Sequence, residues 1–294
     1  MSNRLEFLVY GMPRGGTSAV ARYISAVDAL HCGQEVFPIG LDHSTIEVPN
    51  GFLSPQAKRW NDSSIEEITR KKDSIKVYGN KTPEYFYRLP SLLRQLGNVP
   101  TIACVRNPRS VAISYSTRAL KPEDPWREGR QGIFAVGDAL MLVHALHHSP
   151  RDAEILIVPQ RALLADWYGT MVKAINHITP NVPVDFNPEA LEKINSIKTR
   201  QTNRQKVELQ LIEERALRRI ESIGLAELFD RDEVFTVRDV RDQLAQIVAD
   251  GPRNPIGFIS RMVAEHPDLR THEYLEKWTR TAARTWRTMN SEMA

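Results

Sequence analysis

The sequence has only two cysteines, Cys32 and Cys104, among its 294 residues. Two thiols are too few for a disulfide framework or a four-cysteine zinc site. No apolar run approaches the ~20 residues that cross a bilayer, and the N-terminal apolar stretch is broken at Glu6 and Gly11, unlike a secretory signal. Lys+Arg (39) nearly balance Asp+Glu (36), and a net charge of +3 gives no argument for a nucleic-acid partner. These absences predict a soluble, cytoplasmic protein without a transmembrane anchor.

The composition is that of an ordinary globular protein, with 41% apolar and 26% charged residues. The length suits one large α/β domain, and no linker long enough to separate independent domains is evident. We therefore expect a single domain over 1–294. It would comprise an α/β core over about 1–200 and a helical extension over about 205–294.

Short apolar runs alternate with segments of helical period. The runs predict strands at 5–10, 75–78, 101–105 and 154–158. Alternation of this kind favours βαβ units, so the predicted fold class is α/β, with a central parallel sheet flanked by helices on both faces. From about Lys206 the pattern becomes helical, and the C-terminal third is expected to be mostly helix.

A glycine-rich turn, GMPRGGTS, joins the first predicted strand to a helix. Gly11 and Gly16 have the spacing of the two glycines of a P-loop, and Ser18 stands at the metal-binding hydroxyl. Thr17 replaces the P-loop lysine, which argues against kinase or ATPase chemistry. Backbone N–H groups at a helix N-terminus still bind phosphate, and Arg14 would add a positive charge.

A second anion site is predicted at VRNPRSVAIS, where Arg106 ends a strand and Ser114 follows about two helical turns later. Together, PRGGTS and the Arg106–Ser114 pair resemble the 5′-phosphosulfate loop and the 3′-phosphate motif of sulfotransferases that use 3′-phosphoadenylyl sulfate (PAPS). The resemblance covers about residues 5–175 and implies the P-loop-like fold of that family.

Two further segments sharpen the resemblance. LHCGQE is similar to the segment that carries the catalytic base of tyrosylprotein sulfotransferases, which places the base at Glu35. NKTPEY resembles the lysine segment of tyrosylprotein and heparan sulfotransferases, with Lys81 at the sulfuryl group. Pro83 stands where cytosolic relatives carry a histidine base, so the glutamate-base branch is implied. Gln34 and the pair Gln160-Arg161 depart from the family pattern.

The resemblance implies a role for each matching residue. Glu35 would take the proton of an acceptor hydroxyl, and Lys81 with Arg14 would stabilise the leaving phosphate. The residues implied to hold PAPS are Arg14, Gly15, Gly16, Thr17, Ser18, Arg106, Ser114 and Lys198. No metal is required, and the histidines at 144, 147 and 148 lack the arrangement of a metal cluster.

Each assignment has a simpler alternative. Glu35 could be a surface carboxylate, with His43 next in line as the base, and Arg106 could pair with a carboxylate at the sheet edge. Lys81 and the basic segment around Lys198 could be solvated. As whole functions, a P-loop phosphotransferase and a non-catalytic PAPS- or PAP-binding protein stay open. The acceptor, whether glycan, small molecule, lipid or tyrosyl, is expected to contact 37–72, 119–136 and the C-terminal helices.

Overall fold

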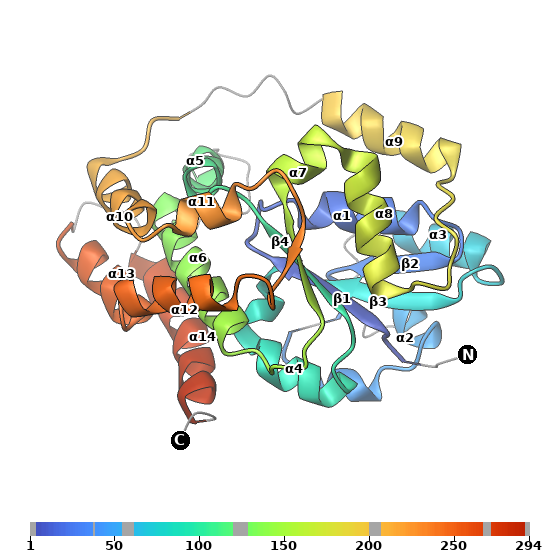
Figure 1. The fold of residues 1–294 in the computed structure, drawn as a ribbon, viewed down its shortest axis with the longest axis horizontal. Coiled ribbons are helices and arrows are strands. Elements are labelled where there is room, and N and C mark those ends of the chain that lie inside the picture. Colours follow the sequence, from blue (N-terminus) through green and yellow to red (C-terminus); the bar gives the residue numbers. More distant parts are fainter. Residues whose placement is uncertain are drawn as a thin grey trace.

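The computed structural model describes residues 4–37, 39–54, 62–119, 129–199, 207–266 and 272–291. Its centre is a six-stranded sheet with the order β2-β3-β1-β4-β5-β6 (Figure 1). The strands are β1 (Phe7–Gly11), β2 (Leu30–Gln34), β3 (Val77–Lys81), β4 (Thr101–Val105), β5 (Ile155–Pro159) and β6 (Phe235–Thr236). The first five strands pair in parallel, and this confirms the predicted α/β class.

The four predicted strands are present, with small shifts at their ends. The largest shift is in β3, which begins at Val77 and runs through Lys81, so that this lysine is the last residue of a strand. Two strands were not predicted. β2 carries His31, Gly33 and Gln34 and therefore lacks the β-branched run that marks a strand. β6 comes from the C-terminal third, expected to be helical, and pairs antiparallel with β5.

One face of the sheet is covered by the helix that follows β1 and by the three helices that follow β5. These helices are α1 (Thr17–Ser25), α7 (Gln160–Ala165), α8 (Trp167–Ile178) and α9 (Pro188–Thr199). Alternate strand residues such as Phe7, Val9 and Ile102 point to this face and belong to one apolar cluster with residues of α1 and α8. The apolar side of α1 is therefore fixed against β1, directly after the glycine-rich loop.

The opposite face carries a larger apolar core. The elements next to the sheet on this side are η1 (His43–Thr45), α2 (Asn50–Leu53), α3 (Asp62–Lys71), η2 (Pro83–Arg88), α4 (Leu89–Leu96), α5 (Pro108–Ala119) and α6 (Gly132–His147). Nearly all of α6 is buried, because the C-terminal helices lie against its outer side. A helix that is apolar all round is a buried helix, which explains why α6 shows no amphipathic pattern.

The C-terminal third forms an outer layer over α6 (Figure 1). Its helices are α10 (Leu211–Glu221), α11 (Leu225–Phe229), α12 (Arg241–Asp250), α13 (Pro255–Ala264) and α14 (His272–Ser291). A buried carboxylate, Asp138 of α6, fixes α14 by accepting a hydrogen bond from Trp278 Nε1 at 2.9 Å. Within the described ranges, no helix has both the length and the apolar character that crossing a membrane requires.

Candidate functional site

The glycine-rich loop between β1 and α1 adopts a conformation that glycine makes possible. Gly11 has φ +146°, and a Cβ there would lie 1.9 Å from the carbonyl oxygen of Cys104 in β4. Gly16 precedes α1 with φ +103°, and no side chain caps the helix at that position. The first N–H groups of α1 are therefore available to an anion, as the sequence predicts for a phosphate cradle.

Three residues from separate segments meet beside this loop. Lys81 Nζ lies 2.7 Å from Glu35 Oε1 and donates a hydrogen bond to Ser18 Oγ at 3.2 Å. The Lys81 side chain is 2% exposed, whereas that of Glu35 is 40% exposed. β3 supplies the lysine, the residue after β2 supplies the carboxylate, and the first turn of α1 supplies the hydroxyl. Because parallel strands end at the same sheet edge, these elements bring together residues that are distant in sequence.

The backbone is strained at two of the candidate catalytic residues. Arg14 and Glu35 have φ of 68° and 57°, and in the described part of the chain Asn98 is the one other non-glycine residue with positive φ. The Glu35 N–H donates to the Lys81 carbonyl at 2.6 Å, which holds the carboxylate beside the lysine on the neighbouring strand. Left-handed backbone at non-glycine residues costs about 1–3 kcal/mol and clusters at functional sites.

The two predicted phosphate sites lie next to one another. Arg14 Nε donates to Ser114 Oγ at 3.2 Å, and an Arg106 Nη donates to the Arg14 carbonyl at 3.4 Å. Burial lowers the pKa of Arg106, and the nearby charge of Asp230 opposes that shift. Arg14 therefore lies between the start of α1 and α5, where it can reach groups bound at either site.

Asp230 was missed by sequence reasoning. It follows α11, and its Oδ2 accepts a hydrogen bond from Asn107 Nδ2 at 3.4 Å and lies 3.8 Å from Arg161 Nη1. No local motif surrounds this aspartate. Its neighbours come from the ends of β4 and β5, so only the packing of the C-terminal layer places it near Arg106. Arg161, which departs from the family pattern, has this carboxylate as its partner.

His43, the alternative base, is buried in a different network. Its Nε2 lies 2.8 Å from the Tyr85 hydroxyl and its Nδ1 lies 2.9 Å from the Leu41 carbonyl oxygen. A carbonyl oxygen only accepts, so Nδ1 carries the proton and Nε2 accepts from Tyr85. The Tyr85 hydroxyl also accepts from Asn80 Nδ2. Burial lowers the pKa of His43, and both ring nitrogens already have partners.

The sequence predictions also concern Lys198 and the histidines near the end of α6. The side chain of Lys198, at the end of α9, lies outside the described residues. His144, His147 and His148 lie at the end of α6, where the ring of His144 contacts Trp286 with 4.8 Å between centroids. Among the residues that the structure describes, no group of three His, Cys, Asp or Glu side chains is placed to hold a metal ion.

The model of the sulfotransferase family matches residues 7–179, which is more than half of the chain. A sulfotransferase from Alicyclobacillus acidocaldarius has a similar fold, with a TM-score of 0.50 and 14% identity over 79% of this chain and 98% of that one. A mouse sulfotransferase, SULT7A1 complexed with PAP, gives a TM-score of 0.40 and 18% identity over 70% and 69% of the two chains. No curated protein sequence matches this chain.

Proposed function

The chain belongs to the sulfotransferase family, and on this premise we propose that it transfers a sulfuryl group from PAPS to an acceptor hydroxyl with Glu35 as the general base. One observation carries the proposal. Lys81 Nζ, Glu35 Oε1 and Ser18 Oγ meet at the carboxyl edge of the parallel strands, beside a phosphate loop that lacks the P-loop lysine. Such a site provides a cation, a base and a phosphate cradle together, the combination that sulfuryl transfer requires.

The reaction divides into a nucleophile side and a leaving-group side. On the nucleophile side, the acceptor oxygen forms a bond to sulfur while Glu35 takes the hydroxyl proton. On the leaving-group side, the bond between sulfur and the bridging oxygen breaks, and its electron pair stays on the 5′-phosphate of 3′,5′-ADP. Lys81 and Arg14 stabilise the charge that develops there.

The remaining residues bind the nucleotide. The backbone of Gly15 and Gly16, with Thr17 and Ser18, holds the 5′-phosphate at the start of α1. Arg106 and Ser114 hold the 3′-phosphate, and Lys198 contributes a further charge. A guanidinium and a hydroxyl both donate to phosphate oxygens, and they would select a nucleotide with a 3′-phosphate over ATP.

The ion pair between Lys81 and Glu35 supports a sequence of events at the site. Before the donor binds, the carboxylate neutralises the buried ammonium group of Lys81. When the phosphosulfate enters the loop, Lys81 turns to the bridging oxygen. Glu35 then loses its nearest cation and is free to accept the acceptor proton.

A substitution of the proposed base tests the mechanism. Glu35→Gln keeps the shape of the side chain and removes its basicity, so we expect single-turnover sulfation to slow by about 10²–10⁴-fold. Affinity for 3′,5′-ADP, measured by calorimetry, should change little, and Glu227→Gln on the exposed side of α11 is the matched control. Near-normal turnover would remove Glu35 from the mechanism. Loss of both turnover and nucleotide binding would mean that Glu35 has a structural role.

Nucleotide affinities test the proposed 3′-phosphate site. Arg106→Ala should weaken 3′,5′-ADP about 10- to 150-fold, the equivalent of ~1.5–3 kcal/mol for a charge-assisted hydrogen bond. Binding of 5′-AMP should hardly change, and the exposed Arg151→Ala is the control. Equal weakening of both nucleotides would show that Arg106 does not recognise the 3′-phosphate. Tight ATP binding by the unaltered protein would instead favour a phosphotransferase.

A further inference from the structure

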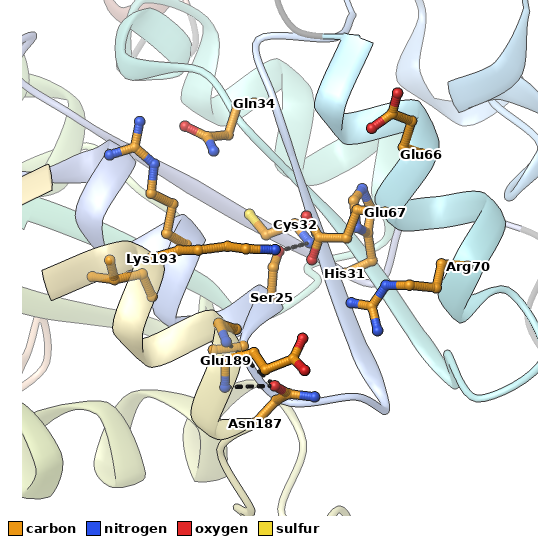
Figure 2. Close-up of a pocket in the computed structure, with 14 residues that line it drawn as sticks. Ser25, His31, Cys32, Gln34, Glu66, Glu67, Arg70, Asn187, Glu189 and Lys193 are labelled. Carbon is orange, nitrogen blue, oxygen red and sulfur yellow. Dashed lines mark hydrogen bonds between the residues drawn. The ribbon is translucent and has the colours of Figure 1, made fainter. Parts of the chain in front are cut away.

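A cleft of about 610 Å³ runs along the free edge of β2 (Figure 2). Its walls come from α1 and α9, which cover one face of the sheet, and from α3 on the other side of the edge strand. Two backbone groups of this edge, the Leu30 carbonyl and the Cys32 N–H, already have side-chain partners. Lys71 Nζ donates to the carbonyls of Ser25 and Leu30 at 2.7 and 3.3 Å, and the Cys32 N–H donates to Ser25 Oγ at 3.0 Å. These bonds leave the edge poorly suited to pairing with an added peptide strand.

One end of the cleft lies next to the proposed catalytic residues, none of which lines it. Gln34 lines it, precedes Glu35 and lies opposite Lys81 in the register of β2 and β3. Arg22 also lines it and stands one helical turn beyond Ser18 on α1. A molecule lying along the edge of β2 would therefore place one end near the strand terminus that Glu35 follows.

The lining is polar and carries both signs of charge. Three side chains are cationic and three are carboxylates: Arg22, Arg70, Lys193, Glu66, Glu67 and Glu189. Among the residues that the structure describes, none of the three cations forms an ion pair. Burial lowers the pKa of Arg22 and raises that of Glu67, so both charges are poorly solvated where they stand. Glu67 pairs with Lys71 at 3.9 Å, whereas the hydrogen-bonding groups of the three cations remain available to a ligand.

A buried histidine in the lining also lacks a partner. His31 is 2% exposed, and neither of its ring nitrogens has a hydrogen-bond partner within the described ranges. Its ring contacts Phe52 edge-on, with 5.2 Å between centroids. A buried imidazole that hydrogen-bonds to nothing is destabilising. Both ring nitrogens are closed off from the cleft, so this side chain gives a ligand no contact.

We infer that this cleft binds a neutral, polyhydroxylated molecule, and that this molecule is the acceptor of the proposed sulfuryl transfer. Hydroxyl groups both donate and accept, so one such ligand can satisfy ammonium, guanidinium and carboxylate groups together. An aromatic or lipid acceptor would meet few apolar walls, and a polyanionic glycan would meet three carboxylates. The identity of the acceptor rests on the proposed function, whereas the binding site does not.

Direct binding tests the inference without any transfer reaction. The protein is saturated with 3′,5′-ADP and titrated with cellotriose, maltotriose and myo-inositol, with a heparin tetrasaccharide and 4-nitrophenol as comparators, by calorimetry and ligand-observed NMR. We expect at least one of the neutral probes to bind, and Glu189→Ala and Lys193→Ala to weaken it about 10-fold or more. Glu192→Ala on the same helix and Lys173→Ala on α8 are exposed controls that should leave binding unchanged.

Three results would overturn the inference. The first is binding of none of the neutral probes, and the second is preference for heparin or 4-nitrophenol. The third is a parallel loss of 3′,5′-ADP affinity in the Glu189 and Lys193 variants, which would make the cleft part of the nucleotide site. Thermal unfolding of each variant separates misfolding from lost contacts. Because Glu35→Gln should still bind the neutral probe, failure of the catalytic proposal and failure of this inference give different results.

Discussion

Two carboxylates of this protein stand in opposite environments. Glu35, at the carboxyl edge of the sheet, is 40% exposed and pairs with the buried Lys81. Asp138, inside α6, is fully buried and accepts hydrogen bonds from the Tyr87, Tyr115 and Trp278 side chains and from Arg130. A carboxylate with all its acceptor positions filled serves to hold elements together. A half-exposed carboxylate with a single strong partner can still accept hydrogen bonds from a substrate.

The largest expected effect comes from removing the buried carboxylate. Asp138→Ala leaves Arg130 as a largely buried charge and deprives two tyrosines and a tryptophan of their acceptor. We expect the free energy of unfolding to fall by about 3–5 kcal/mol, measured by urea denaturation. The exposed Glu192→Ala is the control. A loss below ~1 kcal/mol would show that the network around Asp138 is not what attaches α14 to α6.

Mild acid should destabilise the protein through its buried histidines. Burial, and next the charge of Lys71, lowers the pKa of His31 to about 3. Burial, and next the neighbouring histidines, does the same for His144. Since an unfolded histidine takes up a proton near pH 6.5 and the folded one does not, each group favours the folded state fully above that pH and less as the pH falls toward 3. The expected loss is about 2 kcal/mol per histidine at pH 5.

This pH dependence has a direct measurement. Urea denaturation at pH 7.5 and pH 5.0 should show a smaller difference for His31→Phe than for the unaltered protein, by about 2 kcal/mol. The comparison is between the two pH values within one variant, so a change in overall stability does not affect it. An unchanged difference would place the acid-sensitive group elsewhere.

A smaller effect is expected from removing one donor of the closed network. Trp278→Phe keeps most of the ring and deletes the N–H that donates to Asp138 at 2.9 Å. The expected loss is about 1 kcal/mol of unfolding free energy, because Asp138 retains three other donors. Hydrogen exchange of α14 should rise in parallel. Full retention of stability would indicate that apolar packing alone holds this helix.

The smallest change in stability is expected at Glu35. Glu35 is half-exposed, and the amide oxygen of a glutamine can still accept a hydrogen bond from the buried Lys81 Nζ, so Glu35→Gln should cost about 1 kcal/mol or less of unfolding free energy. The same variant is expected to be severely impaired in turnover. A stability loss as large as that of Asp138→Ala would remove the distinction between the two carboxylates.

Local sequence patterns predicted part of the framework that surrounds the candidate site. The strand over 101–105 was predicted to the residue, and the glycine-rich loop was placed between a strand and a helix, as observed. β2 was missed because LHCGQ has few strand-forming side chains and gains its place by pairing with β3. The antiparallel β6 was missed because a strand of two residues is too short to show an alternating apolar pattern.

For the candidate site, too, local motifs were predictable and contacts between distant segments were not. Arg14, Lys81, Arg106 and Ser114 could be proposed from sequence because each lies in a short motif at the end of a strand or the start of a helix. The sequence could not predict that Arg14 would contact Ser114, that Asp230 would approach Arg106, or that Tyr85 would engage His43. These contacts join segments that are far apart in the sequence, so no local pattern indicates them.

What the sequence determined by itself is the order of strand, loop and helix and the residue types at their junctions, because short-range sterics and apolar periodicity act within a few residues. The tertiary structure decided which polar side chains face one another. Asp138 gained its partners only when η2, α5 and α14 were assembled around α6, and the cleft exists only because β2 is the last strand of the sheet. Burial and charge pairing depend on that assembly, and they decide whether a carboxylate holds the fold together or remains available for chemistry.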